Sequence, residues 1–162
     1  MELYNPSRIT LTCSVCFVSA PKCFFDTNIL VYQLDKKDSV KNQKCRNLFK
    51  KIATNGEGVI STQVLQEYYV TTTGKLKLDP IVIKNIIHSF QNMEIVCIGS
   101  DLIDEAIDTS IQNKLSFWDS LIIVAAESAN CEILYSEDLS DGQIIKNLKI
   151  VNPLKEKNED MV

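Results

Sequence analysis

Residues 23–32 read CFFDTNILVY, an apolar run that a single acidic residue, Asp26, interrupts. The first three residues are typical of a short strand in the buried centre of a sheet. A carboxylate among bulky apolar neighbours is costly to bury unless a hydrogen bond, a counter-ion or a metal compensates its charge. We therefore expect Asp26 to end a strand and to have a compensating partner elsewhere in the chain.

Further short apolar runs follow at intervals along the chain, and they predict four more strands: GVIS (58–61), EIVCI (94–98), CEILYS (131–136) and KIV (149–151). Helical patterns separate them at 39–54, 62–73, 81–91, 101–113 and 117–129, and a short helix is expected at 139–147. Strands that alternate with helices predict βαβ units with right-handed crossovers. The expected fold is therefore α/β with a parallel sheet that is covered on both faces.

The chain of 162 residues is expected to form one domain, from 22 to 152. Residues 1–21 faintly resemble a signal peptide, but the apolar stretch is diluted by Thr, Ser and Cys. We expect a loosely attached extension or a start-site artefact there, and a charged tail at 153–162. No apolar run reaches the roughly 18 residues that span a bilayer, so no membrane association is expected.

The formal net charge of −4 excludes a general attraction to polyanions, so local lysines or bound cations must attract any nucleic acid. Nine basic residues are candidates: Lys36, Lys37, Lys41, Lys44, Arg46, Lys50, Lys51, Lys75 and Lys77. They can form a solvated helix face, or they can guide RNA. Both interpretations stay open.

Six cysteines lie at positions 13, 16, 23, 45, 97 and 131. Since they are scattered and several lie in apolar strand-like runs, we expect reduced thiols and a cytoplasmic location. Cys13 and Cys16 have the spacing that begins many zinc sites, but no second Cys/His pair follows at a suitable spacing.

Four acidic residues occupy positions of special interest. Asp26 and Asp138 each follow a predicted strand, Glu67 lies in the helix after the second strand, and Asp119 lies in the first turn of the helix at 117–129. Ligands of open parallel sheets bind outside the carboxyl ends of the strands, so these four carboxylates can converge there.

Each acid also has a structural explanation of its own. Asp119 stands three residues after Ser116 and can complete a capping box. Asp138 can favour a helix macrodipole, Glu67 can face solvent, and Asp26 can cap a turn. Among the four, Asp26 is the hardest to explain in this way, because its neighbours are apolar.

Clustering would favour a metal site. Two carboxylates about 4 Å apart repel each other by roughly 4 kcal/mol at an effective dielectric constant near 20. A divalent cation removes that cost, and ligands that are all oxygen atoms select hard ions such as Mg²⁺ or Mn²⁺. The sole histidine, His88, lies among isoleucines in a predicted helix and is expected to be structural.

Residues 22–152 resemble the PIN domain family, and in particular its VapC-type toxins. The match rests on four stretches in order: FFDTNILVY (24–32), ISTQVLQEYY (60–69), LSFWDSLIIVAA (115–126) and ILYSEDLSDGQ (133–143). The resemblance implies a three-layer α/β/α fold, endoribonuclease activity that depends on Mg²⁺ or Mn²⁺, a homodimer and a cognate antitoxin.

The resemblance also assigns roles to individual residues. The metal ligands and catalytic acids would be Asp26, Glu67, Asp119 and Asp138. Supporting polar residues would be Thr27, Asn28 and Ser61. Glu137 and Asp141 remain alternatives to Asp138 as the fourth acid.

Two other functions stay open at this stage. A domain of this fold can bind RNA or protein with a catalytically idle site. The same metal centre can also hydrolyse phosphate esters in DNA or small molecules. Because all four acids are present, the nuclease interpretation is favoured.

Overall fold

The computed structural model describes residues 20–54 and 57–155. Most of the predicted extension 1–21 and of the predicted tail 153–162 therefore lies outside the described residues. The Cys13–Cys16 pair lies outside them as well. Of the four cysteines that are described, all are free thiols; Cys97 is exposed and the other three are buried.

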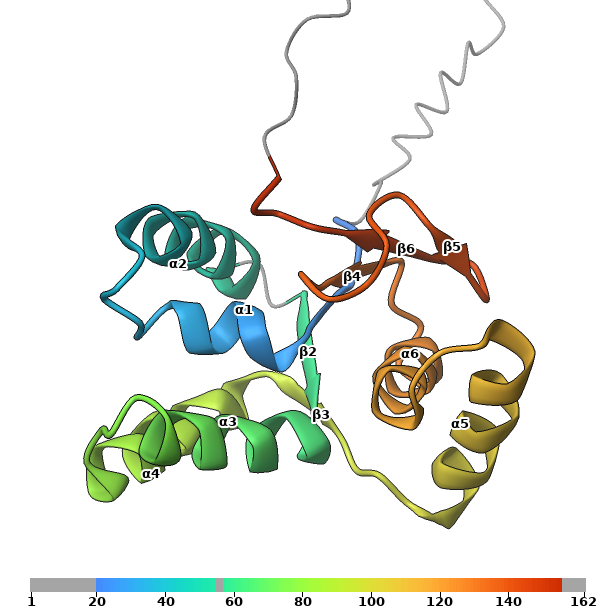
Figure 1. The fold of residues 1–162 in the computed structure, drawn as a ribbon, viewed down its shortest axis with the longest axis horizontal. Helices are drawn as coiled ribbons and strands as arrows, with labels where there is room; N and C mark the ends of the chain where they lie inside the picture. Colours follow the sequence, from blue (N-terminus) through green and yellow to red (C-terminus); the bar gives the residue numbers. More distant parts are fainter. Residues whose placement is uncertain (1–19, 55–56, 156–162) are drawn as a thin grey trace, which may run out of the picture.

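Six strands form one mostly parallel sheet (Figure 1). The strands are β1 (Cys23–Phe25), β2 (Gly58–Ser61), β3 (Glu94–Val96), β4 (Ile133–Tyr135), β5 (Ile144–Ile145) and β6 (Leu148–Val151). Their order across the sheet is β3-β2-β1-β4-β6-β5, and every pairing is parallel except that of β5 with β6. The predicted α/β fold with a parallel sheet is confirmed.

Helices cover the two faces of this sheet. They are α1 (Thr27–Tyr32), α2 (Ser39–Thr54), α3 (Thr62–Gly74), α4 (Pro80–Ser89), α5 (Ser100–Asn113) and α6 (Phe117–Ser128), with a 3₁₀ turn, η1, at Phe90–Asn92. Helices α1 to α4 lie on one side of the sheet and α5 and α6 on the other (Figure 1). Right-handed crossovers explain this division, because the chain moves outward from β1 to β3 and then returns to β4 on the far side of β1.

The sheet centre is the hydrophobic core. All side chains of β1 and β2 are buried, which agrees with their continuous apolar runs. The middle of α6, from Ser120 to Ala126, is buried on every side because it packs against both the sheet and α5. No helix within residues 20–54 and 57–155 is long and apolar enough to cross a membrane.

The predicted helix at 139–147 is wrong, because residues 139–143 form bends and turns and residues 144–147 form the first strand and the turn of a hairpin with β6. Ile144 pairs with Lys149 and Ile145 with Leu148 in an antiparallel ladder. The two residues between the strands, Lys146 and Asn147, have positive φ angles of 50° and 66°. Two consecutive residues with positive φ form the turn whose twist suits a tight hairpin, so the chain reverses there instead of continuing as a helix.

The stretch after Asp26 forms a short helix that the apolar run alone did not indicate. The Asp26 side chain accepts a hydrogen bond from the Thr27 N–H and caps α1. Ile29, Leu30 and Val31 are then buried in the core.

The order of the strands places a topological switch point between β1 and β4. From β1 the chain continues to β2 on one side, while β4 pairs with β1 on the other. Phe25 and Tyr135 are partners at the ends of these strands, and the Asp26 N–H donates to the Tyr135 carbonyl at 3.0 Å. Ligand sites of open parallel sheets lie at such a point, outside the carboxyl ends of the strands.

Candidate active site

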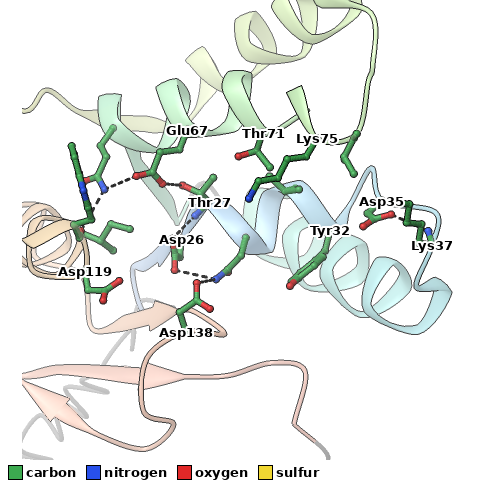
Figure 2. A pocket seen from close by; sticks show the side chains of 16 residues that line it. Asp26, Thr27, Tyr32, Asp35, Lys37, Glu67, Thr71, Lys75, Asp119 and Asp138 are labelled. Carbon is green, nitrogen blue, oxygen red and sulfur yellow. Dashed lines mark hydrogen bonds between the residues drawn. The ribbon is translucent and has the colours of Figure 1, made fainter. Parts of the chain in front are cut away.

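A cavity of about 520 Å³ lies at this switch point, and all four predicted acids line it (Figure 2). Asp26 follows β1, Asp138 follows β4, and Glu67 and Asp119 come from α3 and α6. Thr27 and Asn28, two of the three predicted supporting residues, line the same cavity. Segments that are far apart in sequence therefore contribute carboxylates to the lining of one cavity.

Asp26 is buried, with only 6% of its surface exposed, and three donors compensate its carboxylate. Oδ1 accepts from the Thr27 N–H at 2.6 Å. Oδ2 accepts from the Ser136 hydroxyl at 2.7 Å and from the Asn28 side-chain amide at 3.3 Å. No basic side chain is among these three partners, so within residues 20–54 and 57–155 only neutral groups donate hydrogen bonds to an ionised Asp26.

Burial therefore raises the pKa of Asp26 from its ordinary 3.8 to about 6. The hydrogen bonds from Ser136 and Thr27 oppose this rise, while the negative charges of Asp138 and Glu67 add to it. A cation in the cavity would favour the ionised form.

Asn28 joins the two acids at the strand ends. Its side-chain NH₂ donates to Asp138 Oδ2 at 2.9 Å as well as to Asp26 Oδ2. Its Oδ1 atom is buried and has no hydrogen-bond partner within the described residues. The same is true of the Oε1 atom of Gln63, which lines the same cavity. Buried oxygen atoms without a donor indicate room for a bound water or ion.

Glu67 lies next to this group, held by neutral donors. The Thr27 hydroxyl donates to Glu67 Oε2 at 2.7 Å, and the Gln63 side-chain amide donates to Oε1 at 3.0 Å. Thr27 thus links Glu67 to Asp26, its sequence neighbour (Figure 2).

Asp119 takes part in the cap of α6 and also lines the cavity. Its N–H donates to the hydroxyl of Ser116, the N-cap of α6, at 3.1 Å. The same hydroxyl donates to Asp119 Oδ2 at 2.7 Å. Capping therefore fixes the position of a carboxylate that also lines the cavity.

The structure separates Asp138 from its two acidic alternatives. Glu137 accepts hydrogen bonds from the Tyr32 hydroxyl and the Lys41 ammonium. The carboxylate of Asp141 accepts from the Asn152 N–H at 2.8 Å. Of the three acids, Asp138 is the one that lines the cavity.

Ser61 does not join the other supporting residues. Its hydroxyl accepts the Val64 N–H at 3.3 Å and caps α3, and its side chain is fully buried away from the cavity lining. The structure therefore places Ser61 as a cap that positions the helix of Glu67.

Ser136 is a site residue that the sequence analysis missed. Its buried hydroxyl donates to Asp26 and accepts the Asp138 N–H at 3.2 Å, so it connects the acids at the ends of β1 and β4. Ser136 is the last residue of the predicted strand CEILYS, and residues at the carboxyl ends of neighbouring parallel strands lie at the same sheet edge, so the sequence did indicate this position.

The residues fit a hydrated, hard cation. Within residues 20–54 and 57–155, no three Asp, Glu, His or Cys side chains are close enough to hold one ion among them. Neutral donors such as Asn28 lie between the carboxylates instead. Mg²⁺ is commonly bound by only one or two carboxylates and keeps several waters, so a cavity lined by spaced oxygen ligands suits it.

A mostly parallel α/β sheet with acidic side chains at its switch point is an arrangement that suits metal-assisted chemistry on phosphates. Residues 23–140 match the family model of the PIN domain, and the chain belongs to this family, whose members are typically nucleases that use divalent metals. None of the curated proteins matches the sequence significantly.

Several solved structures share the fold. VapC20 of Mycobacterium tuberculosis, a toxin that cleaves the sarcin-ricin loop, aligns with a TM-score of 0.61 at 15% identity, over 72% of this chain and 91% of that chain. A toxin–antitoxin complex from Klebsiella pneumoniae aligns with a TM-score of 0.60 at 20% identity, over 81% of this chain and 97% of that chain. DNA-bound VapBC from Salmonella typhimurium aligns with a TM-score of 0.59 at 16% identity, also over 81% of this chain and 97% of that chain. At these identities the similarity establishes the fold alone.

Proposed function

We propose that this PIN domain is a divalent-metal-dependent endoribonuclease that hydrolyses RNA phosphodiester bonds and acts as the toxin of a toxin–antitoxin pair. The observation that carries the proposal is the convergence of Asp26, Glu67, Asp119 and Asp138 on one cavity at the switch point of the sheet. Membership of a family of nucleases supports the reaction class.

One or two hydrated Mg²⁺ or Mn²⁺ ions would bind across the four acids, with water completing the coordination, because no three described acids are close enough to hold one ion directly. When bound, the ion supplies a water of lowered pKa and stabilises the negative charge that develops on the phosphate. Asn28 and Thr27 hold the carboxylates of Asp138 and Glu67 in place through their hydrogen bonds. Ser136 favours the ionised form of Asp26, because its hydroxyl donates to that carboxylate.

A protein antitoxin is part of the proposal, since two of the similar structures are toxin–antitoxin or VapBC complexes. Exposed apolar side chains on α3 and α4, including Val70 and Ile81, offer a surface for an antitoxin or for a homodimer. Tyr68, also on α3, is only 1% exposed and belongs to the core, so it is not part of this surface. The free thiols of the four described cysteines support the cytoplasm as the location.

A substrate panel tests the proposed reaction. Single-stranded RNA, duplex DNA and a generic phosphomonoester are each incubated with the purified chain in Mg²⁺, Mn²⁺ or EDTA. We expect internal cleavage of the RNA with either metal and none in EDTA. Hydrolysis of DNA or the monoester without cleavage of RNA would favour the phosphoesterase alternative, and RNA binding without cleavage in any metal would favour an idle binding module.

The Ser136→Ala substitution tests the residue that links the two strand ends. Without its hydroxyl the ionised Asp26 loses a donor, so the pKa of Asp26 rises above its already raised value. We expect kcat/KM for RNA to fall about 10- to 100-fold and the acid limb of its pH profile to move to higher pH. Ser128→Ala is the matched control, because in the described part of the chain the Ser128 hydroxyl donates only to the Ala125 carbonyl of its own helix. A profile that keeps its midpoint would contradict this role.

A further inference from the structure

Asp138 is the one exposed residue among the four acids, and it lies in a bend outside any helix or strand. Asp26 is buried, and Glu67 and Asp119 belong to helices. An exposed side chain outside regular structure has many accessible conformations, and fixing one of them costs conformational entropy. A carboxylate in this position therefore needs neighbours that hold the bend in place if it is to contribute to a metal site.

Glu137, the residue before Asp138, is held by donors from two helices. The Tyr32 hydroxyl, from α1, donates to Glu137 Oε2, and the Lys41 ammonium, from α2, donates to Oε1. The Lys41 ammonium also lies 4.7 Å from the centre of the Tyr32 ring, which is a cation–π distance. All three side chains are partly buried, so solvent screens their charges less than at an open surface. Because hydrogen bonds between charged groups are stronger than neutral ones, this cluster of Tyr32, Lys41 and Glu137 fixes the Glu137 side chain.

Helix α2 is itself fixed at the point where Lys41 leaves it. The side-chain amide of the next residue, Asn42, donates to three carbonyls at the end of α1 and in the loop after it: Tyr32 at 3.0 Å, Gln33 at 2.9 Å and Asp35 at 3.2 Å. Among the residues that the structure describes, α2 contributes none to the lining of the cavity. Any influence of Lys41 on the acids must therefore pass through Glu137 or Tyr32.

The direct contacts of Asp138 are with neutral groups. Its carboxylate accepts from the Asn28 side-chain amide at 2.9 Å, and its N–H donates to the Ser136 hydroxyl at 3.2 Å. Tyr32 lines the same cavity as Asp138 (Figure 2). The charged contact of the bend is thus made one residue earlier, at Glu137. Consecutive Cα atoms are only about 3.8 Å apart, so fixing Glu137 limits where the backbone of Asp138 can lie.

We propose that Lys41, together with Tyr32 and Glu137, is a positioning residue that holds Asp138 in place for the divalent ion. This inference rests on the proposed function, because it concerns the same metal site. Lys41 touches neither the ion nor the substrate. It ties the bend that carries Asp138 to a helix outside the cavity, and the carboxylate is thereby ordered before the ion binds.

Binding of Mn²⁺ to the full chain, measured by the loss of the EPR signal of free Mn²⁺, tests this role without RNA. Lys41→Met removes the ammonium group and keeps the length of the side chain. We expect its Kd for Mn²⁺ to rise about 10-fold, the lower end of the effect of residues that orient metal ligands. Lys41→Arg keeps the charge and should retain the affinity of the parent. The matched control, Lys146→Met, removes an ammonium group that pairs with Glu105 and Glu127 on other helices, and its Kd should equal that of the parent.

Further measurements separate positioning from a general loss of structure. Glu137→Gln removes the partner charge, so its Kd should rise as well, and the test does not depend on one variant. In the Asp138→Asn background, Lys41→Met should change Kd by less than about twofold, because the residue through which it acts has been replaced. Amide hydrogen exchange of residues 136–141 in metal-free buffer should be severalfold faster in Lys41→Met than in the parent and unchanged in Lys146→Met.

An unchanged Mn²⁺ affinity in Lys41→Met and Glu137→Gln would overturn the inference. So would a loss of affinity that is as large with Asp138→Asn as without it, or unchanged amide exchange at 136–141. A parent chain that cleaves RNA while its Mn²⁺ affinity is insensitive to Lys41 refutes only the positioning role. A parent chain that shows the expected Mn²⁺ binding but cleaves no RNA refutes only the nuclease, and one that binds no Mn²⁺ refutes both.

Discussion

Replacing Asp26 by asparagine is expected to reduce RNA cleavage by at least 100-fold, roughly 10²–10⁴, while the fold is retained. Asp26 is the buried acid at the switch point, and it lies beside Asn28, which contacts Asp138 as well. A neutral amide there weakens the hold on a cation that supplies several kcal/mol of charge stabilisation to the transition state. The measurement is kcat/KM on single-stranded RNA with Mg²⁺.

The control for this variant is Asp141→Asn. Asp141 lies three residues after Asp138 in the same loop, but its carboxylate accepts from the Asn152 N–H, and an asparagine oxygen can keep this bond. The control should cleave RNA as the parent does. Equal rates for Asp26→Asn and the parent, with both proteins folded by circular dichroism, would remove Asp26 from the mechanism.

In metal-free buffer, Asp26 is expected to make the protein less stable as the pH rises from about 4 to 6. In the folded state the pKa of Asp26 is about 6, so the carboxyl group keeps its proton until the pH approaches 6. In the unfolded chain the pKa has its ordinary value of 3.8, so the proton is released near pH 3.8. Between these values the folded state binds more protons, so the free energy of unfolding falls with rising pH. The loss levels off about one pH unit above 6 and amounts to about 3 kcal/mol.

Urea denaturation of the parent and of Asp26→Asn in EDTA, at several pH values, measures this contribution. The difference between the two proteins cancels the other titrating groups. We expect the variant to gain stability relative to the parent as the pH rises through this window and to remain the more stable one at neutral pH. A difference that does not vary with pH would show that Asp26 titrates normally. Addition of Mn²⁺ should stabilise the parent more than the variant.

The arrangement of the acids was predictable because it depends on topology more than on side-chain detail. The short apolar runs predict parallel strands, and the carboxyl ends of neighbouring parallel strands meet at one edge. Asp26 and Asp138 follow two such strands, so their proximity follows from the order of the elements. The same alternation of apolar runs and helical patterns was sufficient to predict the α/β fold.

The predictions that failed concern local conformations and contacts that depend on residues distant in sequence. Lys146 and Asn147 adopt positive φ, which turned an expected helix into a hairpin. The choice among the acids of the 137–141 loop depends on Tyr32 and Lys41, which lie about a hundred residues away in sequence and engage Glu137. The contribution of Ser136 likewise depends on which strand lies beside β1.

The most direct measurement is a crystal of the protein soaked in Mn²⁺, with the anomalous signal used to locate the ion. We expect a peak inside the cavity that Asp26, Glu67, Asp119 and Asp138 line, and none there in Asp26→Asn crystals. A parent crystal that shows no manganese in this cavity, while its RNA is still cleaved in Mn²⁺, would contradict the central claim that these carboxylates form the metal site.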